Sequence, residues 1–114
     1  MGADHSNESI SPALEERAKM REAQHDLLVA GAKDLTSQTA RSLAIGLVRS
    51  TFDYYCAEVE REPLPQLEPR IEGLKEVLEG AAAGDDTKLI AYLGTYGGRL
   101  GEKMRIVIPL ISQR

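Results

Sequence analysis

The motif whose spacing is typical of metal chemistry is EAQH, from Glu22 to His25. This E-x-x-H spacing puts a carboxylate and an imidazole on one face of a helix, as in di-iron helical bundles. A symmetric dimer would supply a second copy, and Asp53 or Glu58 would add bridging carboxylates. We interpret the pair as a solvent-exposed helix face and predict no metal and no cofactor. A dimeric di-iron protein remains an alternative.

Cys56 is the single cysteine and a candidate nucleophile. As a nucleophile it would need a neighbouring base, and no histidine lies close to it in the sequence. No serine occupies a G-x-S-x-G setting, and no pair of carboxylates stands out. We therefore predict a protein that is not an enzyme. A lone cysteine cannot form an internal disulfide, which favours the cytoplasm, and no membrane association is expected.

Basic residues near the C-terminus form a candidate nucleic-acid surface. On a helix, Arg99 and Lys103 lie one turn apart, Lys88 is close to Arg99, and Tyr92 falls between the two former residues. Such a group can bind a phosphate backbone and stack a base. Residues 87–114 hold five bases against one acid, whereas residues 58–86 hold nine acids against three bases. The alternative is that this basic face pairs with the acidic segment within the fold.

The elements that must position these residues are helices. Hydrophobic residues make up 42% of the chain and aromatic residues only 4%, so the core must be aliphatic. We predict an all-α bundle of four main helices, completed by oligomerisation, with a disordered tail over residues 1–10 and a single helical domain over 11–114. The helices are expected over 11–32, over 36–60, from about 69 to 84 and from about 86 onward, with turns at 33–36, 62–68 and 82–86.

The glycine-rich stretch GTYGGRLG, residues 94–101, lies inside the cleanest amphipathic pattern of the chain. At 100° per residue the apolar residues from Leu89 to Ile111 share one stripe, which predicts a helix that continues through the glycines. Close packing of a second helix would offset their low helix propensity. The predicted packing residues are Ser42, Gly46 and Ser50 on the second helix and Leu93, Gly94, Gly97, Leu100 and Gly101 on the fourth. The alternatives are a kink at Gly97–Gly98, a ligand loop, and a short strand over 105–111.

Two stretches resemble a known family. LTSQTAR, residues 35–41, is similar to the opening of a helix in the small subunit of type III-A CRISPR effector complexes, and AYLGTYGGR, residues 91–99, resembles the ending of that subunit. The resemblance implies an all-helical, non-catalytic subunit that stacks along a guide RNA and its target. It makes Arg41 and Arg99 candidate contacts to the nucleic-acid backbone.

Three functions follow from these observations. The first is a non-catalytic helical assembly subunit or adaptor that acts through its helix faces, as a homo-oligomer or with a protein partner. The second is an RNA-associated small subunit of a CRISPR effector complex. The third is the dimeric di-iron protein.

Overall fold

A computed structural model describes residues 12–31 and 33–113, and these residues are helical apart from short connections. The elements are α2 (Pro12–Val29), α3 (Ser37–Arg61), a 3-10 turn η1 (Pro65–Leu67), α4 (Glu68–Ala82), α5 (Thr87–Leu93) and α6 (Gly98–Ser112). The prediction of an all-α fold is confirmed, with no strand in the described ranges. The predicted tail over 1–10 and the capping residue expected at Ser11 lie outside the described residues.

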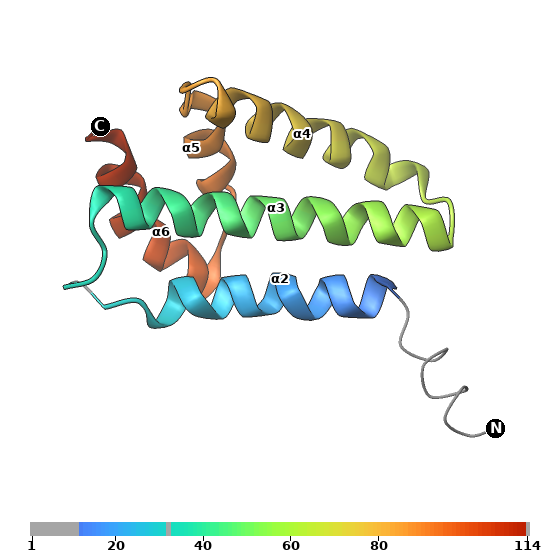
Figure 1. The fold of residues 1–114 in the computed structure, drawn as a ribbon, viewed down its shortest axis with the longest axis horizontal. Helices are drawn as coiled ribbons and strands as arrows, with labels where there is room; N and C mark the ends of the chain where they lie inside the picture. Colours follow the sequence, from blue (N-terminus) through green and yellow to red (C-terminus); the bar gives the residue numbers. More distant parts are fainter. Residues whose placement is uncertain (1–11, 32, 114) are drawn as a thin grey trace.

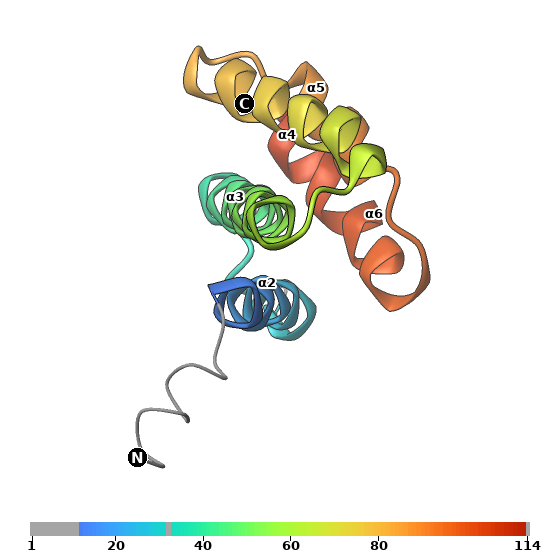
Figure 2. The same ribbon diagram turned by 90° about the vertical axis from the view of Figure 1, so that its right-hand side faces the viewer.

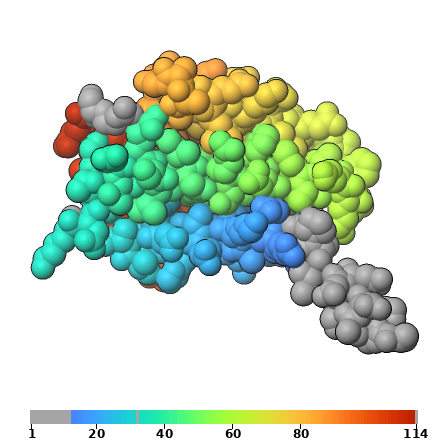
Figure 3. Space-filling view, viewed as in Figure 1, coloured from blue at the N-terminus to red at the C-terminus, as the bar shows by residue number. Residues whose placement is uncertain are grey.

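Helix α3 is the central element of the fold. Helices α2 and α4 lie on opposite sides of it, and α5 and α6 cover a third side (Figures 1 and 2). Every other α-helix contacts α3. A space-filling view shows the opposite side, where α2, α3 and α4 all reach the surface (Figure 3). The fold therefore has one side covered by α5 and α6 and one side where three helices remain open.

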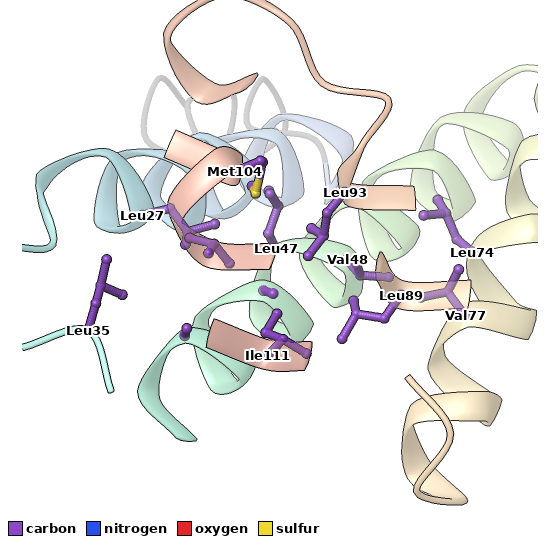
Figure 4. Packing of buried hydrophobic residues seen from close by; sticks show 13 residues of the cluster. Leu27, Leu35, Leu47, Val48, Leu74, Val77, Leu89, Leu93, Met104 and Ile111 are labelled. Carbon is purple, nitrogen blue, oxygen red and sulfur yellow. The ribbon is translucent and has the colours of Figure 1, made fainter. Parts of the chain in front are cut away.

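The core is aliphatic, as predicted, and forms around α3, where α4, α5 and α6 pack against it (Figure 4). Leu47, Leu89 and Leu93 are fully buried there. Helix α2 contributes little, because its buried apolar residues are Ala13 and Leu27. The remaining buried apolar side chains are Leu35, Ala40, Ala44, Val48, Leu74, Val77, Ala81, Met104, Val107 and Ile111.

The ends of α3 and α4 follow local signals in the sequence. The Thr36 hydroxyl accepts a hydrogen bond of 3.1 Å from the Thr39 backbone N–H and so caps α3. Pro65 begins the 3-10 turn that leads into α4. At the other end of α4, Gly84 has φ of +86°, and the Asp85 N–H bonds back to the Gly80 carbonyl at 2.8 Å. This left-handed glycine termination ends the helix.

The predicted continuous fourth helix is wrong, because the chain breaks between Leu93 and Gly98. Gly97 is extended, with φ of −117° and ψ of −173°, and Gly98 has φ of +64°. An uninterrupted helix would bear a cost of about 1 kcal/mol for each glycine in it. The break takes Gly94 and Gly97 out of the helices, and α5 and α6 then pack on the core as separate helices. The kink alternative at Gly97–Gly98 thus comes closest to the structure.

The alternative of a strand over residues 105–111 is also wrong, since α6 runs through this segment to Ser112. Pro109 lies inside α6 and has no N–H to donate to the carbonyl of Arg105 four residues earlier. The helix continues because Val107 and Ile111 on either side are buried in the core. Within the described ranges, no helix combines the length and the apolar composition needed to cross a bilayer.

Candidate interaction surfaces

Arg41, one of the predicted nucleic-acid contacts, is bonded within the fold. Its Nε and Nη2 atoms donate to both carboxylate oxygens of Asp86 at 2.9–3.2 Å, and Nη2 also donates to the Ala81 carbonyl at 2.7 Å. The two side chains are only 21% and 12% exposed. The hydrogen bond to Asp86 raises the pKa of the Arg41 guanidinium. This bidentate pair ties the start of α3 to the α4–α5 connection.

The other predicted cations do not form one surface. Lys88 Nζ donates to a carboxylate oxygen of Glu76 at 2.9 Å, so this base does pair with the acidic segment 58–86. Lys103 Nζ donates to the Ala30 carbonyl and joins α6 to the end of α2. Arg99 is exposed in the first turn of α6 and makes no hydrogen bond or ion pair within the described ranges.

Tyr92, predicted to stack on a base, points its hydroxyl into the fold. The Tyr92 and Tyr96 hydroxyl oxygens lie 2.9 Å apart, and the two rings pack edge to face at 5.5 Å between centroids. Burial is the main cause that raises the pKa of both phenols, and the hydrogen bond to Tyr96 raises that of Tyr92 further. The pair joins α5 to the glycine-rich turn, so its geometry is that of a structural contact.

Within one chain the glycines do not form the predicted shelf for a neighbouring helix. A β-carbon at Gly97 would meet nothing within 4 Å, and at Gly94 it would meet only carbonyl oxygens of α5 at ordinary contact distance. Gly101 differs, because its β-carbon would lie 2.6 Å from the Tyr96 carbonyl oxygen. The close approach at Gly101 is to the turn itself. Leu93 is buried in the core and Leu100 packs against its edge.

The small residues of α3 are also not covered by another helix. Ser42 and Gly46 are exposed, and a β-carbon on Gly46 would meet nothing within 4 Å. The Ser50 hydroxyl donates to the Gly46 carbonyl at 2.8 Å. Within one chain these three residues therefore make no close helix crossing.

The residues with potential chemistry remain scattered. Glu22 and His25 are exposed on α2, and the described residues contain no group of three or more metal-ligating side chains close enough to hold an ion. The Glu58 carboxylate accepts hydrogen bonds from Tyr54 and Arg61. Burial, followed by the nearby charges of Asp53 and Glu60, raises the pKa of the Cys56 thiol. A raised pKa disfavours the thiolate that a nucleophile requires.

A surface that the sequence reasoning did not single out lies between α2 and α3. Two shallow hollows share Arg17 and Tyr54, and we call them together the α2–α3 groove. Arg17, Arg21 and His25 follow one another at intervals of four residues along α2 and are all exposed. The other lining residues are Ala13, Leu14, Met20, Gln24, Leu28, Glu58 and Arg61.

The groove is basic in an otherwise acidic protein. Three arginines line it against one acid, Glu58, whereas the whole chain has a net charge of −4. Glu58 takes a hydrogen bond of 3.0 Å from Arg61, and Arg17 and Arg21 make none within the described residues. The four-residue spacing of Arg17, Arg21 and His25 was the available signal in the sequence. Tyr54 and Arg61 of α3 join these residues in one groove only because α2 packs against α3.

No protein-family model matches the chain, and no curated protein or solved structure is significantly similar to it.

Proposed function

We propose that this protein is a non-catalytic helical assembly subunit or adaptor that acts through the faces of its helices. The observation that carries the proposal is the composition of the α2–α3 groove. Arginine, tyrosine, methionine and leucine line it, and no lysine does. Arginine, methionine and aromatic residues are enriched at protein interfaces, whereas lysine is depleted there.

Exposed apolar side chains on α2 support the same function. Leu14, which lines the groove, is 53% exposed, and Val29 is 61% exposed at the end of the same helix. Helix α2 has few buried apolar residues of its own, so a partner that covers it would add buried apolar area. The raised pKa of Cys56 supports a role without nucleophilic catalysis.

The test is the mass of the purified full chain in solution together with co-purification from its native cells. We expect either a homo-oligomer or a stoichiometric complex with a protein partner. A monomer at all concentrations that also co-purifies with no stoichiometric protein contradicts the proposal.

A second candidate is association with RNA, and the exposed, unbonded Arg99 is the observation that favours it. Phosphate contacts by arginine give an affinity that falls as salt rises. Filter binding of single-stranded RNA by wild type and by Arg99→Ala tests this candidate directly. Loss of binding in the variant supports it, and absence of RNA binding by the wild type removes it.

A further inference from the structure

Helix α4 carries a row of glutamates along its outer side, which we call the α4 acidic stripe. Its members are Glu68, Glu72, Glu76 and Glu79, at intervals of four, four and three residues, and all are exposed. Glu76 is bonded to Lys88, and the other three accept no hydrogen bond within the described ranges. Lys75 lies beside the stripe on the same helix and offsets one of its four negative charges. The face therefore keeps a net negative charge.

The α2–α3 groove carries the opposite charge at the same spacing. Arg17, Arg21 and His25 are four residues apart, about 6 Å along a helix axis at a rise of about 1.5 Å per residue. Glu68, Glu72 and Glu76 of the stripe are also four residues apart, and Glu79 follows three residues later. Two helices that lie nearly parallel or antiparallel can therefore bring several opposite charges together in register.

The two charged surfaces cannot meet within one chain. Helices α2 and α4 lie on opposite sides of α3 in both ribbon views (Figures 1 and 2). Any contact between the groove and the stripe must therefore join two copies of the chain.

A protein helix suits the groove better than a nucleic-acid strand does. Met20, Leu28 and the exposed Leu14 line it together with the arginines, and a helix laid over the groove removes these apolar side chains from water.

The geometry points to a head-to-tail contact in which the α2–α3 groove of one copy holds the α4 acidic stripe of the next. This inference rests on the proposed assembly function and names the partner as a second copy of this chain. The contact is heterologous, because the two surfaces that meet differ. Its charged residues are exposed, so the association weakens as salt screens them.

Charge reversal tests the contact by sedimentation velocity on the full chain. We expect the wild type to self-associate at low salt, and Arg17→Glu with Arg21→Glu, or Glu72→Lys with Glu79→Lys, to weaken this by more than about tenfold. A mixture of the two variants should associate again, since the intact stripe of one fits the intact groove of the other and their two reversed surfaces are also complementary. All four changes in one chain should restore self-association. The control, Arg99→Glu with Arg105→Glu on α6, should associate like the wild type.

Other outcomes overturn the inference and are distinguishable from failure of the assembly function. If the wild type self-associates but neither pair of reversals changes this, the contact is wrong and another face mediates assembly. If the wild type is monomeric at low salt, the contact is wrong, and co-purification of a different protein decides the assembly function. If the wild type binds single-stranded RNA and the Arg17 and Arg21 reversals abolish only that binding, the groove holds nucleic acid.

Discussion

Two regions of this molecule use the same residue types in opposite ways. In the region where α4, α5 and α6 join, Arg41 is bonded to Asp86 and Tyr92 to Tyr96, and Gly101 approaches the turn closely. Along α2 and the open side of α3, Arg17 is unbonded within the described residues and Gly46 meets open space. The difference shows that the role of an arginine, tyrosine or glycine depends on its neighbours in the fold and cannot be predicted from the residue type alone.

The largest effect on the free energy of unfolding is expected for Arg41, compared with Arg17. Arg41→Ala removes four hydrogen bonds to Asp86 and to the Ala81 carbonyl in a mostly buried setting, so it should lower the free energy of unfolding by about 2–3 kcal/mol. The matched control, Arg17→Ala, should change it by less than about 0.5 kcal/mol. Denaturant unfolding measures both variants. Equal losses would remove the distinction between the two regions.

The two glycines should respond with opposite signs. Gly101→Ala gains about 1 kcal/mol of helix propensity but forces a β-carbon toward the Tyr96 carbonyl oxygen, so we expect a net destabilisation of about 1–2 kcal/mol. Gly46→Ala, in the open middle of α3, should stabilise by about 1 kcal/mol. Thermal unfolding of the two variants gives the signs. A higher melting temperature for Gly101→Ala would mean that the turn can move away.

The partly buried pair of Tyr92 and Tyr96 predicts an alkaline limit to stability. Burial raises the pKa of Tyr92 above its ordinary value of about 10, so the folded state stays protonated where the unfolded state ionises. The contribution of Tyr92 to stability is therefore fully present below about pH 10 and is lost as pH rises further. Tyr92→Phe removes one hydrogen bond, so it should lower the free energy of unfolding by about 1 kcal/mol near neutral pH and by less above pH 10. The free energy of unfolding is measured against pH for wild type and variant, and two parallel curves would contradict this.

The smallest effect is expected at an open position within the region where α4, α5 and α6 join. Gly97 precedes α6 as its N-cap residue, with extended backbone and free space around a β-carbon. Serine there can accept a hydrogen bond from a first-turn N–H, so Gly97→Ser should stabilise by a few tenths of a kcal/mol. The change in denaturation midpoint measures it. A clear loss of stability would show that the turn needs glycine at this position too.

Sequence patterns predicted the elements whose ends are marked locally. The second helix was expected to begin at Thr36 or Ser37, and the Thr36 hydroxyl caps it there. The third was expected from about Pro69 to Gly84, and α4 spans Glu68–Ala82. In these places a cap, a proline or a left-handed glycine fixes the end whatever lies around it.

The glycine-rich turn and the groove could not be predicted in the same way. Leu89 and Leu93 of α5 share a helical period with Met104 and Val107 of α6 because both helices pack on one core, so the period itself carried no sign of the break. The partners of Arg41 and Lys103 are 45 and 73 residues away in the sequence. Only the tertiary arrangement decides which bases are bonded and which line a groove.

The sparse burial of α2 also has a consequence for hydrogen exchange. Among the described residues it buries only Ala13 and Leu27, with Met20 and Ala23 partly buried against the core, whereas α3 buries Ala40, Ala44, Leu47 and Val48. Few buried contacts mean a low free energy of local opening, so the amides of α2 should exchange with solvent well before those of α3. A partner seated on the α2–α3 groove would slow that exchange. Deuterium uptake along α2 therefore reports occupancy of the groove, whatever the partner is.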